Sequence, residues 1–281
     1  MKVVLFCGGQ GLRLRDYSEN IPKPMVNVGY RPILWHIMKY YAHFGHKDFI
    51  LLLGHKGDAI KNYFVNYDEY ITNDFVYSNG GTDMKLLNTD IKDWTITFVD
   101  SGLNANIGER LMTARKYLND EEIFLANYSD GLSDLPLNTM IDDFKQTDYV
   151  GSFLAYQPYH SFHVVTFDNH CEVKNISPMG HSGLWINAGY FVFRNSIFDF
   201  INKGEDLVHE PFLRLIEHHK LMAYKYKGFW QSMDTFKDKQ KIDDMYIAGN
   251  VPWEVWKAKN NDYNPKAFDK AFVRKATVMK S

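Results

Sequence analysis

The stretch KVVLFCGGQGLRLR, residues 2–15, decides the fold of this chain. Residues 2–7 form an almost continuous apolar run that stops at Gly8 and Gly9, as expected for a buried parallel strand followed by a tight turn. Glycines at such a turn let backbone amides approach an anion closely. The opening of the chain therefore predicts an α/β fold with an anion site at a strand end.

The same alternation continues to about residue 130. Apolar runs predict further strands over 48–54, 94–100 and 122–130. The segments between them have helical periodicity, over 32–45, 58–67 and 108–119. This order predicts a doubly wound, mostly parallel sheet with right-handed crossovers. Ligands of such sheets lie at the carboxyl ends of strands, so the Gly8 turn and residues 128–131 should share one edge.

The pattern changes after residue 150. Short strands are predicted over 149–157, 163–168, 172–176, 185–193 and 221–227, with helices over 196–202, 208–219 and 235–248. We expect a mixed-strand region that completes the sheet or forms a wall over the site. The chain is expected to form a single domain over 1–257, with two halves (about 1–150 and about 151–257) and a C-terminal tail (258–281).

Composition excludes several classes of protein. The formal net charge of −2 argues against a partner that is nucleic acid or a membrane surface. Cys7 and Cys171 are too few for a disulfide framework or a structural zinc site, and we expect both to be buried. Neither a signal peptide nor a membrane span is apparent, which predicts a cytoplasmic protein.

The glycine turn does not fit the two best-known nucleotide motifs. A dinucleotide fingerprint would need glycine where Leu14 stands, and the turn lacks the Gly-Lys-Ser/Thr of a P-loop. Downstream of the turn lie Arg13, suited to forked contacts with phosphate, and Lys23, a point charge held between two prolines. These residues predict a triphosphate site.

With GGQGLRLR and the following PKP, the chain resembles the nucleotidyltransferases that join a nucleoside triphosphate to a sugar 1-phosphate. The similarity continues through NYSDGLSDL, WINAGYFVF and GFWQSMDTFKDK, to about residue 257. Within that family these stretches are most similar to the glucose-1-phosphate cytidylyltransferase branch. The resemblance implies a Rossmann-like nucleotidyltransferase fold and attack of an acceptor phosphate on the α-phosphorus of the nucleotide, with loss of pyrophosphate. It also implies that the half over about 1–150 binds the nucleotide and the half over about 151–257 binds the acceptor.

The resemblance also implies a role for particular residues. Arg13 and Lys23 would be catalytic, Asp130 and Asp234 would hold Mg²⁺, and the other implied residues bind the nucleotide (Gly8, Gly9, Gly11, Lys56, Arg110) or the acceptor (Asn187, Trp230). From the residues alone, the first interpretation of Asp130 is a turn residue before Gly131, and Asp234 is equally the N-cap of the helix that begins near Thr235. Asp134 is a second-rank candidate.

Several positions depart from the family pattern. Leu12 replaces a threonine, Ser129 replaces the glycine before the metal aspartate, and Glu109 introduces a carboxylate beside Arg110. The Glu-Lys-Pro motif that grips the sugar phosphate is replaced by residues 177–179, Ser-Pro-Met. Lys174, three residues upstream, is a candidate to supply the missing charge.

The sequence therefore predicts a magnesium-dependent transferase that uses CTP and a phosphorylated acceptor, either glucose 1-phosphate or another sugar or metabolite phosphate, to make a surface polysaccharide precursor. A homo-oligomer is expected. Two alternatives stay open: a catalytically weak homologue that acts as a nucleotide sensor or subunit, and a nicotinamide-dependent oxidoreductase.

Overall fold

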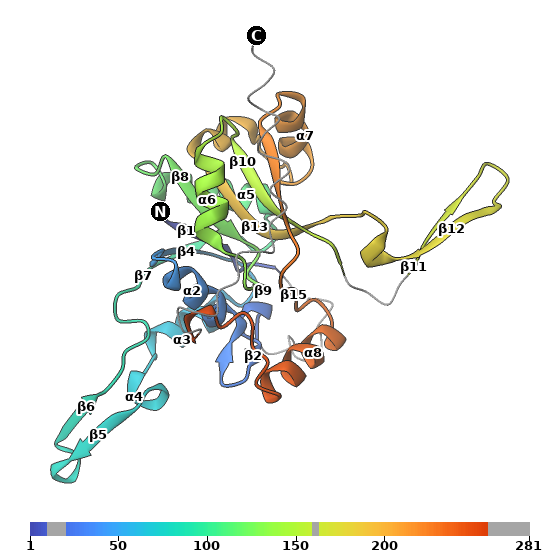
Figure 1. The fold of residues 1–281 in the computed structure, drawn as a ribbon. Coiled ribbons are helices and arrows are strands. Elements are labelled where there is room, and N and C mark those ends of the chain that lie inside the picture. The colour runs from blue at the N-terminus through green and yellow to red at the C-terminus, as the bar shows by residue number, and fades with distance from the viewer. Residues whose placement is uncertain (10–20, 159–162, 258–281) are drawn as a thin grey trace.

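The computed structural model describes residues 1–9, 21–158 and 163–257. At its centre lies a seven-stranded sheet in the order β14-β10-β13-β8-β1-β4-β7 (Figure 1). Among the described strands of this sheet, β13 alone is antiparallel to its neighbours, so the prediction of a mostly parallel sheet is confirmed. The strands are β1 (Val3–Phe6), β4 (Asp48–Leu53), β7 (Thr95–Asp100), β8 (Ile123–Asn127), β10 (Gly151–Tyr156), β13 (Ile186–Arg194) and β14 (Leu221–Tyr226).

Helices cover both faces of the sheet because each strand has apolar side chains on both faces. Val3 and Leu5 of β1 join the core under α2 and α6, whereas Val4 and Phe6 join the core under α5 and α7. The described helices are α2 (Ile33–His43), α3 (Gly57–Val65), α4 (Glu69–Thr72), α5 (Ile107–Ala114), α6 (Leu137–Lys145), α7 (Glu210–Glu217) and α8 (Phe236–Ile247). No helix in the described part of the chain is long and apolar enough to cross a membrane.

Two short strand pairs lie beside the carboxyl ends of the central strands. A 3₁₀ turn over Lys23–Met25 leads into β2 (Asn27–Val28), which pairs with β3 (Arg31–Pro32). In the second pair, β9 (Gly131–Ser133) and β15 (Trp230–Ser232) are antiparallel, with Ser232 opposite Gly131. This second pair joins the two halves of the chain at the edge where we expect ligands.

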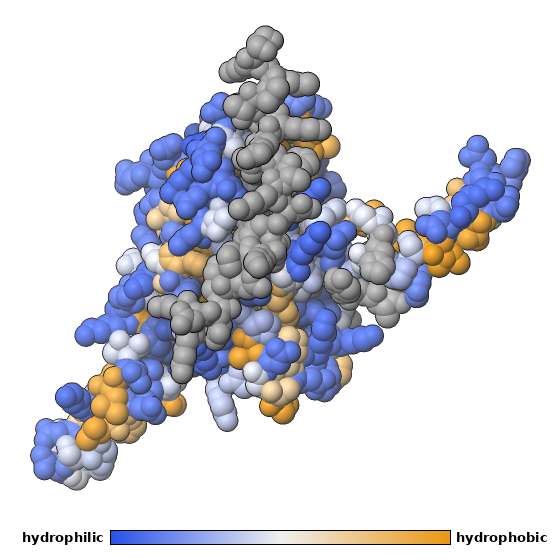
Figure 2. Space-filling model, viewed as in Figure 1, coloured by the Kyte–Doolittle hydropathy of each residue, from blue (hydrophilic) through white to orange (hydrophobic). Residues whose placement is uncertain are grey.

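Two hairpins project from the body as arms (Figure 1). One arm is formed by β5 (Phe75–Ser78) and β6 (Asp83–Leu86), the other by β11 (His163–Phe167) and β12 (Val173–Pro178). Both carry apolar residues on their surface, coloured orange in Figure 2. Cys171 is exposed on the second arm, so the prediction that both cysteines are buried was wrong for this residue.

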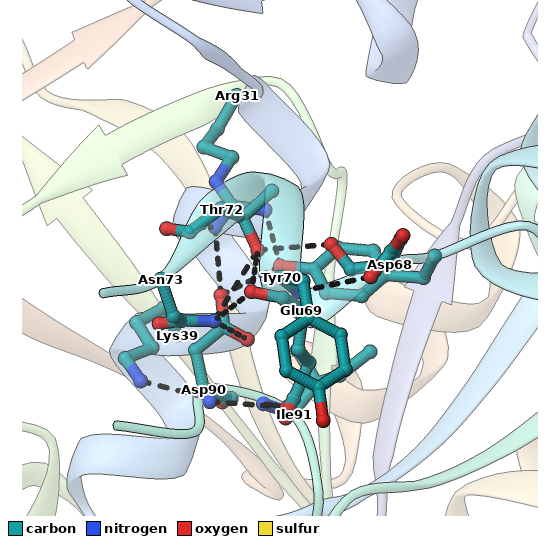
Figure 3. Close-up of polar contacts among 10 residues, drawn as sticks. Arg31, Lys39, Asp68, Glu69, Tyr70, Thr72, Asn73, Asp90 and Ile91 are labelled. Carbon is teal, nitrogen blue, oxygen red and sulfur yellow. Dashed lines mark hydrogen bonds and ion pairs between the residues drawn. The ribbon is translucent and has the colours of Figure 1, made fainter. Parts of the chain in front are cut away.

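The base of the β5–β6 arm is held by a polar network (Figure 3). Arg31 of β3 donates to the Asp90 carboxylate at 2.8 Å, and Asn73 donates to the other oxygen of Asp90 at 3.2 Å. A Glu69 carboxylate oxygen accepts the backbone amides of Asp90 and Ile91. Arg31 and Asp90 are only 14% and 8% exposed, so their ion pair orders the base of the arm.

Most predicted elements lie within a few residues of the observed ones. The short elements α4, β2, β3, β9 and β15 were not predicted, and three longer segments also differ. The segment predicted as a helix over 196–202 is a 3₁₀ helix, Asn195–Phe200. The α6 helix was not predicted because proline and short polar residues precede it. The β5–β6 arm was also missed, since its strands are too short for a clear alternating pattern.

Candidate active site

A cavity of about 590 Å³ opens at the carboxyl ends of β1 and β8, at the edge where the sequence predicted the ligand. Its volume is within the range of ordinary small-molecule sites. The described residues that line it are Phe6, Gly8, Gly9, Lys23, Pro24, Ala105, Asn106, Ile107, Arg110, Tyr128, Asp130, Asp206 and Asp234. Seven of the residues in this lining were not singled out from the sequence as ligands.

Lys23 lies between the two predicted metal ligands. Its ammonium group is 2.7 Å from a carboxylate oxygen of Asp130 and 2.7 Å from one of Asp234. Burial alone would lower the pKa of Lys23, but the two carboxylates outweigh that effect and raise it. Burial raises the pKa of Asp130, and so does repulsion from Asp234. The three side chains form one charged cluster at the mouth of the cavity.

Backbone pairing assembles this cluster. Asp130 directly precedes β9 and Asp234 lies two residues beyond β15, so the pairing of these strands brings the aspartates together. The bond from the Met233 amide to the Asp130 carbonyl, 2.8 Å, extends the pairing by one step. Thr235 is the N-cap of α8, in a capping box with Asp238, so the N-cap alternative for Asp234 was wrong.

The donor set fits magnesium. Mg²⁺ prefers oxygen ligands, keeps several waters and is held by one or two carboxylates together with substrate phosphates. Asp130 and Asp234 supply two such carboxylates, both already beside a cation. The described residues contain no cluster of three or more metal-binding side chains, so the remaining ligands would be phosphate and water.

Arg110 was predicted to bind the nucleotide, but its guanidinium braces the edge of the sheet. One terminal nitrogen donates to the Leu53 carbonyl and the Ser101 hydroxyl, at 3.2 and 2.6 Å. The other donates to the carbonyls of Gly8 and Leu103, at 3.1 and 3.3 Å. Although Arg110 lines the cavity, its terminal N–H groups are directed at the segments that follow β1, β4 and β7.

The two glycines of the turn differ in what they require. A Cβ on Gly8 would lie 2.0 Å from an Arg110 nitrogen, so glycine is needed there for close packing. A Cβ on Gly9 would meet no atom of the described residues within 4 Å, and Gly9 lines the cavity. Gly11 and Arg13 lie outside the described residues, and their roles stay predictions.

Comparison with known proteins identifies the family. The family model described as nucleotidyl transferase matches residues 2–242. The chain belongs to the nucleotidyl transferase family. It is 37% identical over 259 residues to the glucose-1-phosphate cytidylyltransferase of Salmonella typhi, over 91% of this chain and 100% of that protein. It is 33% identical over 258 residues to a probable glucose-1-phosphate cytidylyltransferase of Bacillus subtilis, with the same coverage.

Solved structures share the fold of this transferase. A UDP-glucose pyrophosphorylase in complex with UDP-glucose aligns with a TM-score of 0.65 at 14% identity, over 88% of this chain and 98% of the other. A UTP-bound enzyme from Acinetobacter baumannii aligns with a TM-score of 0.64 at 17% identity, over 87% and 92%. The resemblance and the fold class stated from the sequence are thus confirmed, and the oxidoreductase alternative finds no support.

The predicted acceptor residues of the transferase lie next to the cavity, outside its lining. The Asn187 amide donates to the Tyr128 hydroxyl at 3.4 Å, and its oxygen accepts the Gly189 amide. Trp230 donates its ring N–H to the Ala188 carbonyl at 2.9 Å and packs against Tyr156. Asn187 therefore reaches the cavity lining through its contact with Tyr128.

Two predicted cationic contacts are absent from the described lining of the cavity. Lys56 precedes α3 in a left-handed backbone conformation (φ 52°) and does not line the cavity. Lys174 was a candidate for the lost sugar-phosphate lysine, but its ammonium pairs with Glu172 at 2.9 Å and Asp168 at 3.2 Å on the β11–β12 arm. The prediction that Lys174 replaces the missing sugar-phosphate lysine was therefore wrong.

The structure explains three further residues that the sequence singled out, two carboxylates and one serine. Glu109 forms a capping box with Asn106 at the start of α5, which explains a carboxylate beside Arg110. Asp134 accepts hydrogen bonds from the Tyr226 hydroxyl and the Phe229 amide, so it is structural. Ser129 has φ of 65°, the conformation that glycine adopts most easily, and its amide donates to the Asn127 side chain.

Sequence reasoning missed Tyr128 and Asp206. Tyr128 stands two residues before Asp130, and its place next to this predicted metal ligand was a signal that could have been used. Asp206 lies in a loop between a 3₁₀ helix and α7, where no motif marks it. Only the packing of that loop against the start of α5 brings it to the cavity.

Proposed function

We propose that this transferase moves the cytidylyl group of CTP onto a phosphorylated acceptor, with glucose 1-phosphate as the first candidate. The observation that carries the proposal is the cluster of Lys23, Asp130 and Asp234 at the mouth of the cavity. The names of the two cytidylyltransferase relatives support the choice of nucleotide and acceptor.

In the proposed reaction an acceptor phosphate oxygen attacks the α-phosphorus of CTP. A bond forms between that oxygen and the α-phosphorus, the bond to the β-phosphate oxygen breaks, and pyrophosphate leaves with the bonding electrons. Both reactants are anions, so the protein must position them and neutralise charge. Magnesium bound by Asp130 and Asp234 would supply Lewis-acid neutralisation of the phosphates.

Different residues of the chain would neutralise the phosphate charge and position the phosphates. The Lys23 ammonium reaches the metal aspartates and is therefore within reach of phosphates that share their metal. Gly9 offers a backbone with open space beside it, and Arg110 fixes the carbonyl of the neighbouring Gly8. Arg13 is proposed, from the sequence, to add a forked contact with phosphate.

The choice of acceptor depends on residues outside the cavity lining. Residues 177–179 replace the family's sugar-phosphate motif and lie at the end of β12 and in the 3₁₀ turn that comes after it. Asn187, which donates to the Tyr128 hydroxyl, and Trp230, which donates to the Ala188 carbonyl, would contact the acceptor. The proposal therefore covers glucose 1-phosphate and, as second choice, another sugar or metabolite phosphate.

The test is release of pyrophosphate by purified protein with Mg²⁺, each common nucleoside triphosphate and a panel of phosphorylated acceptors. We expect release with CTP and glucose 1-phosphate. Release with CTP and a different acceptor would place the change of specificity at residues 177–179. Nucleotide binding without release from any mixture would contradict the proposal and favour the alternative of a nucleotide sensor or subunit.

We further propose that the enzyme is a cytoplasmic homo-oligomer that makes a precursor of a surface polysaccharide. The two arms support the oligomer, because each exposes an apolar face formed by opposed residues: Phe75 with Leu86, Tyr77 with Met84, Val165 with Ile176 and Phe167 with Val173. An isolated two-stranded hairpin is marginally stable in water, so these faces favour burial against another copy.

Sedimentation of arm variants tests the oligomer. Tyr77→Ser and Phe167→Ser should lower the sedimenting mass, because each removes an exposed aromatic ring from an apolar arm face. Val76→Ser is the matched control, since Val76 is exposed but lies on the opposite face of β5. A wild-type chain that sediments as a monomer would contradict this part of the proposal.

A further inference from the structure

The lining of the cavity contains two groups of residues that differ in chemistry. Lys23, Asp130 and Asp234 form the first group, called here the charged end. Asn106 and Asp206 belong to the second group, called here the Asp206 end, where Asn106 donates to the Gly204 carbonyl at 2.9 Å and joins the start of α5 to the loop that contains Asp206. Tyr128 is near a carboxylate of each group: burial raises its pKa, and the charges of Asp206 and Asp130 raise it further.

The end at Asp206 is suited to a nucleoside. The charged end is suited to phosphates and metal, and the predicted acceptor residues Asn187 and Trp230 do not line the cavity. What is left for the Asp206 end is the nucleoside of the triphosphate. Ala105 and Ile107 flank Asn106 in the lining, which also includes Phe6, and the apolar surfaces of these side chains suit the flat faces of a base.

Most polar groups at this end are already used by the protein. The side-chain oxygen of Asn106 caps α5 and its amide nitrogen donates to Gly204. The terminal N–H groups of Arg110 donate to protein acceptors. One oxygen of Asp206 accepts the Val208 amide at 3.2 Å, and among the described residues no donor reaches its second oxygen. Asp206 therefore keeps an acceptor for a ligand.

We propose that Asp206 selects cytosine by accepting a hydrogen bond from its exocyclic amine. A carboxylate is only an acceptor, so it pairs with the C4 amine of cytosine and repels the C4 carbonyl of uracil. The contact therefore separates cytosine from uracil. This inference rests on the proposed use of CTP and names the residue that reads the base.

The test compares wild-type protein with Asp206→Asn. Asparagine has the same size, and its oxygen can still accept the Val208 amide, so the loop is preserved. Its amide N–H₂ can donate to the uracil carbonyl. The ratio of kcat/KM for CTP to that for UTP is measured with one acceptor and Mg²⁺, and binding of each nucleotide is measured by calorimetry. We expect the ratio to fall by about tenfold or more, with a loss for CTP and a gain for UTP.

Asp199→Asn is the matched control. It removes one carboxylate from the same region, but Asp199 is exposed and pairs only loosely with Arg115, at 3.7 Å. Its CTP-to-UTP ratio should equal that of the wild type.

Three outcomes would overturn the inference. An equal loss for CTP and UTP in Asp206→Asn would mean a contact with the ribose or a purely structural loop, and 2′-deoxy-CTP would separate these two cases. An unchanged ratio would exclude a role in reading the base. A wild-type protein that binds UTP more tightly than CTP would also contradict it. Tighter binding of CTP without pyrophosphate release would instead refute the proposed function and leave the base selection supported.

Discussion

Removal of the Lys23 ammonium should tighten binding of a divalent cation in the absence of nucleotide. Lys23 neutralises Asp130 and Asp234 at 2.7 Å each, so a metal ion that binds both carboxylates must displace it. In Lys23→Met the two carboxylates are left without this partner, and a cation gains access to both. The same variant should lose activity, because the ammonium no longer neutralises the phosphates.

The magnitude follows from the two contacts. A charge-assisted hydrogen bond contributes about 1.5–3 kcal/mol when buried. The carboxylates are 25% and 37% exposed, which reduces each contact to about 1 kcal/mol. Their sum, about 2 kcal/mol, corresponds to binding that is tighter by about 30-fold.

The assay is titration of Mn²⁺ into nucleotide-free protein, followed by the electron paramagnetic resonance signal of the unbound ion. Lys203→Met provides the control, because it removes an equal charge from an exposed position outside the described cavity lining. Binding of Mn²⁺ to Lys23→Met that equals or falls below wild-type binding would refute the reasoning, since it would mean that Lys23 does not compete with the metal.

Three further predictions concern the glycine turn at Gly8 and Gly9, the backbone at Ser129, and the buried His36. Gly8→Ala should lower the free energy of unfolding by about 1–3 kcal/mol by displacing Arg110, whereas Gly9→Ala should keep wild-type stability but bind CTP more weakly, as shown by thermal denaturation and calorimetry. Ser129→Gly should be more stable than Ser129→Ala by about 1 kcal/mol, because both lose the hydroxyl and only alanine is strained at φ 65°; equal midpoints in urea would contradict this. Burial lowers the pKa of His36 to about 4, so the unfolded chain takes up a proton first and stability should fall as the pH drops from 6.5 toward 4. The loss is about 2 kcal/mol between pH 7 and pH 5, and a His36→Gln variant should lack that part of the pH dependence.

The central sheet could be predicted because its signals are local. The run at Val3–Phe6 is apolar on every residue, and β1 is buried on both faces by helices that its neighbours in sequence provide. The carboxyl end of such a strand is fixed by the direction of the chain, so the place of Gly8 and Gly9 could be derived directly. The β5–β6 arm could not be predicted in this way, because its stability depends on the network around Arg31 and Asp90.

For the site, the sequence determined the residue types and the tertiary structure determined their partners. The motifs named Lys23, Asp130 and Asp234, and the resemblance identified the family. That Lys23 bridges two aspartates 107 and 211 positions away depends on the β9–β15 pairing, which no local pattern encodes. The Arg110 guanidinium donates to groups at the edge of the sheet, and Asp206 lies at the cavity. Both positions likewise result from packing between distant segments. Periodicity is a property of neighbours in sequence, whereas a binding site is formed by groups that meet only when the whole chain has folded.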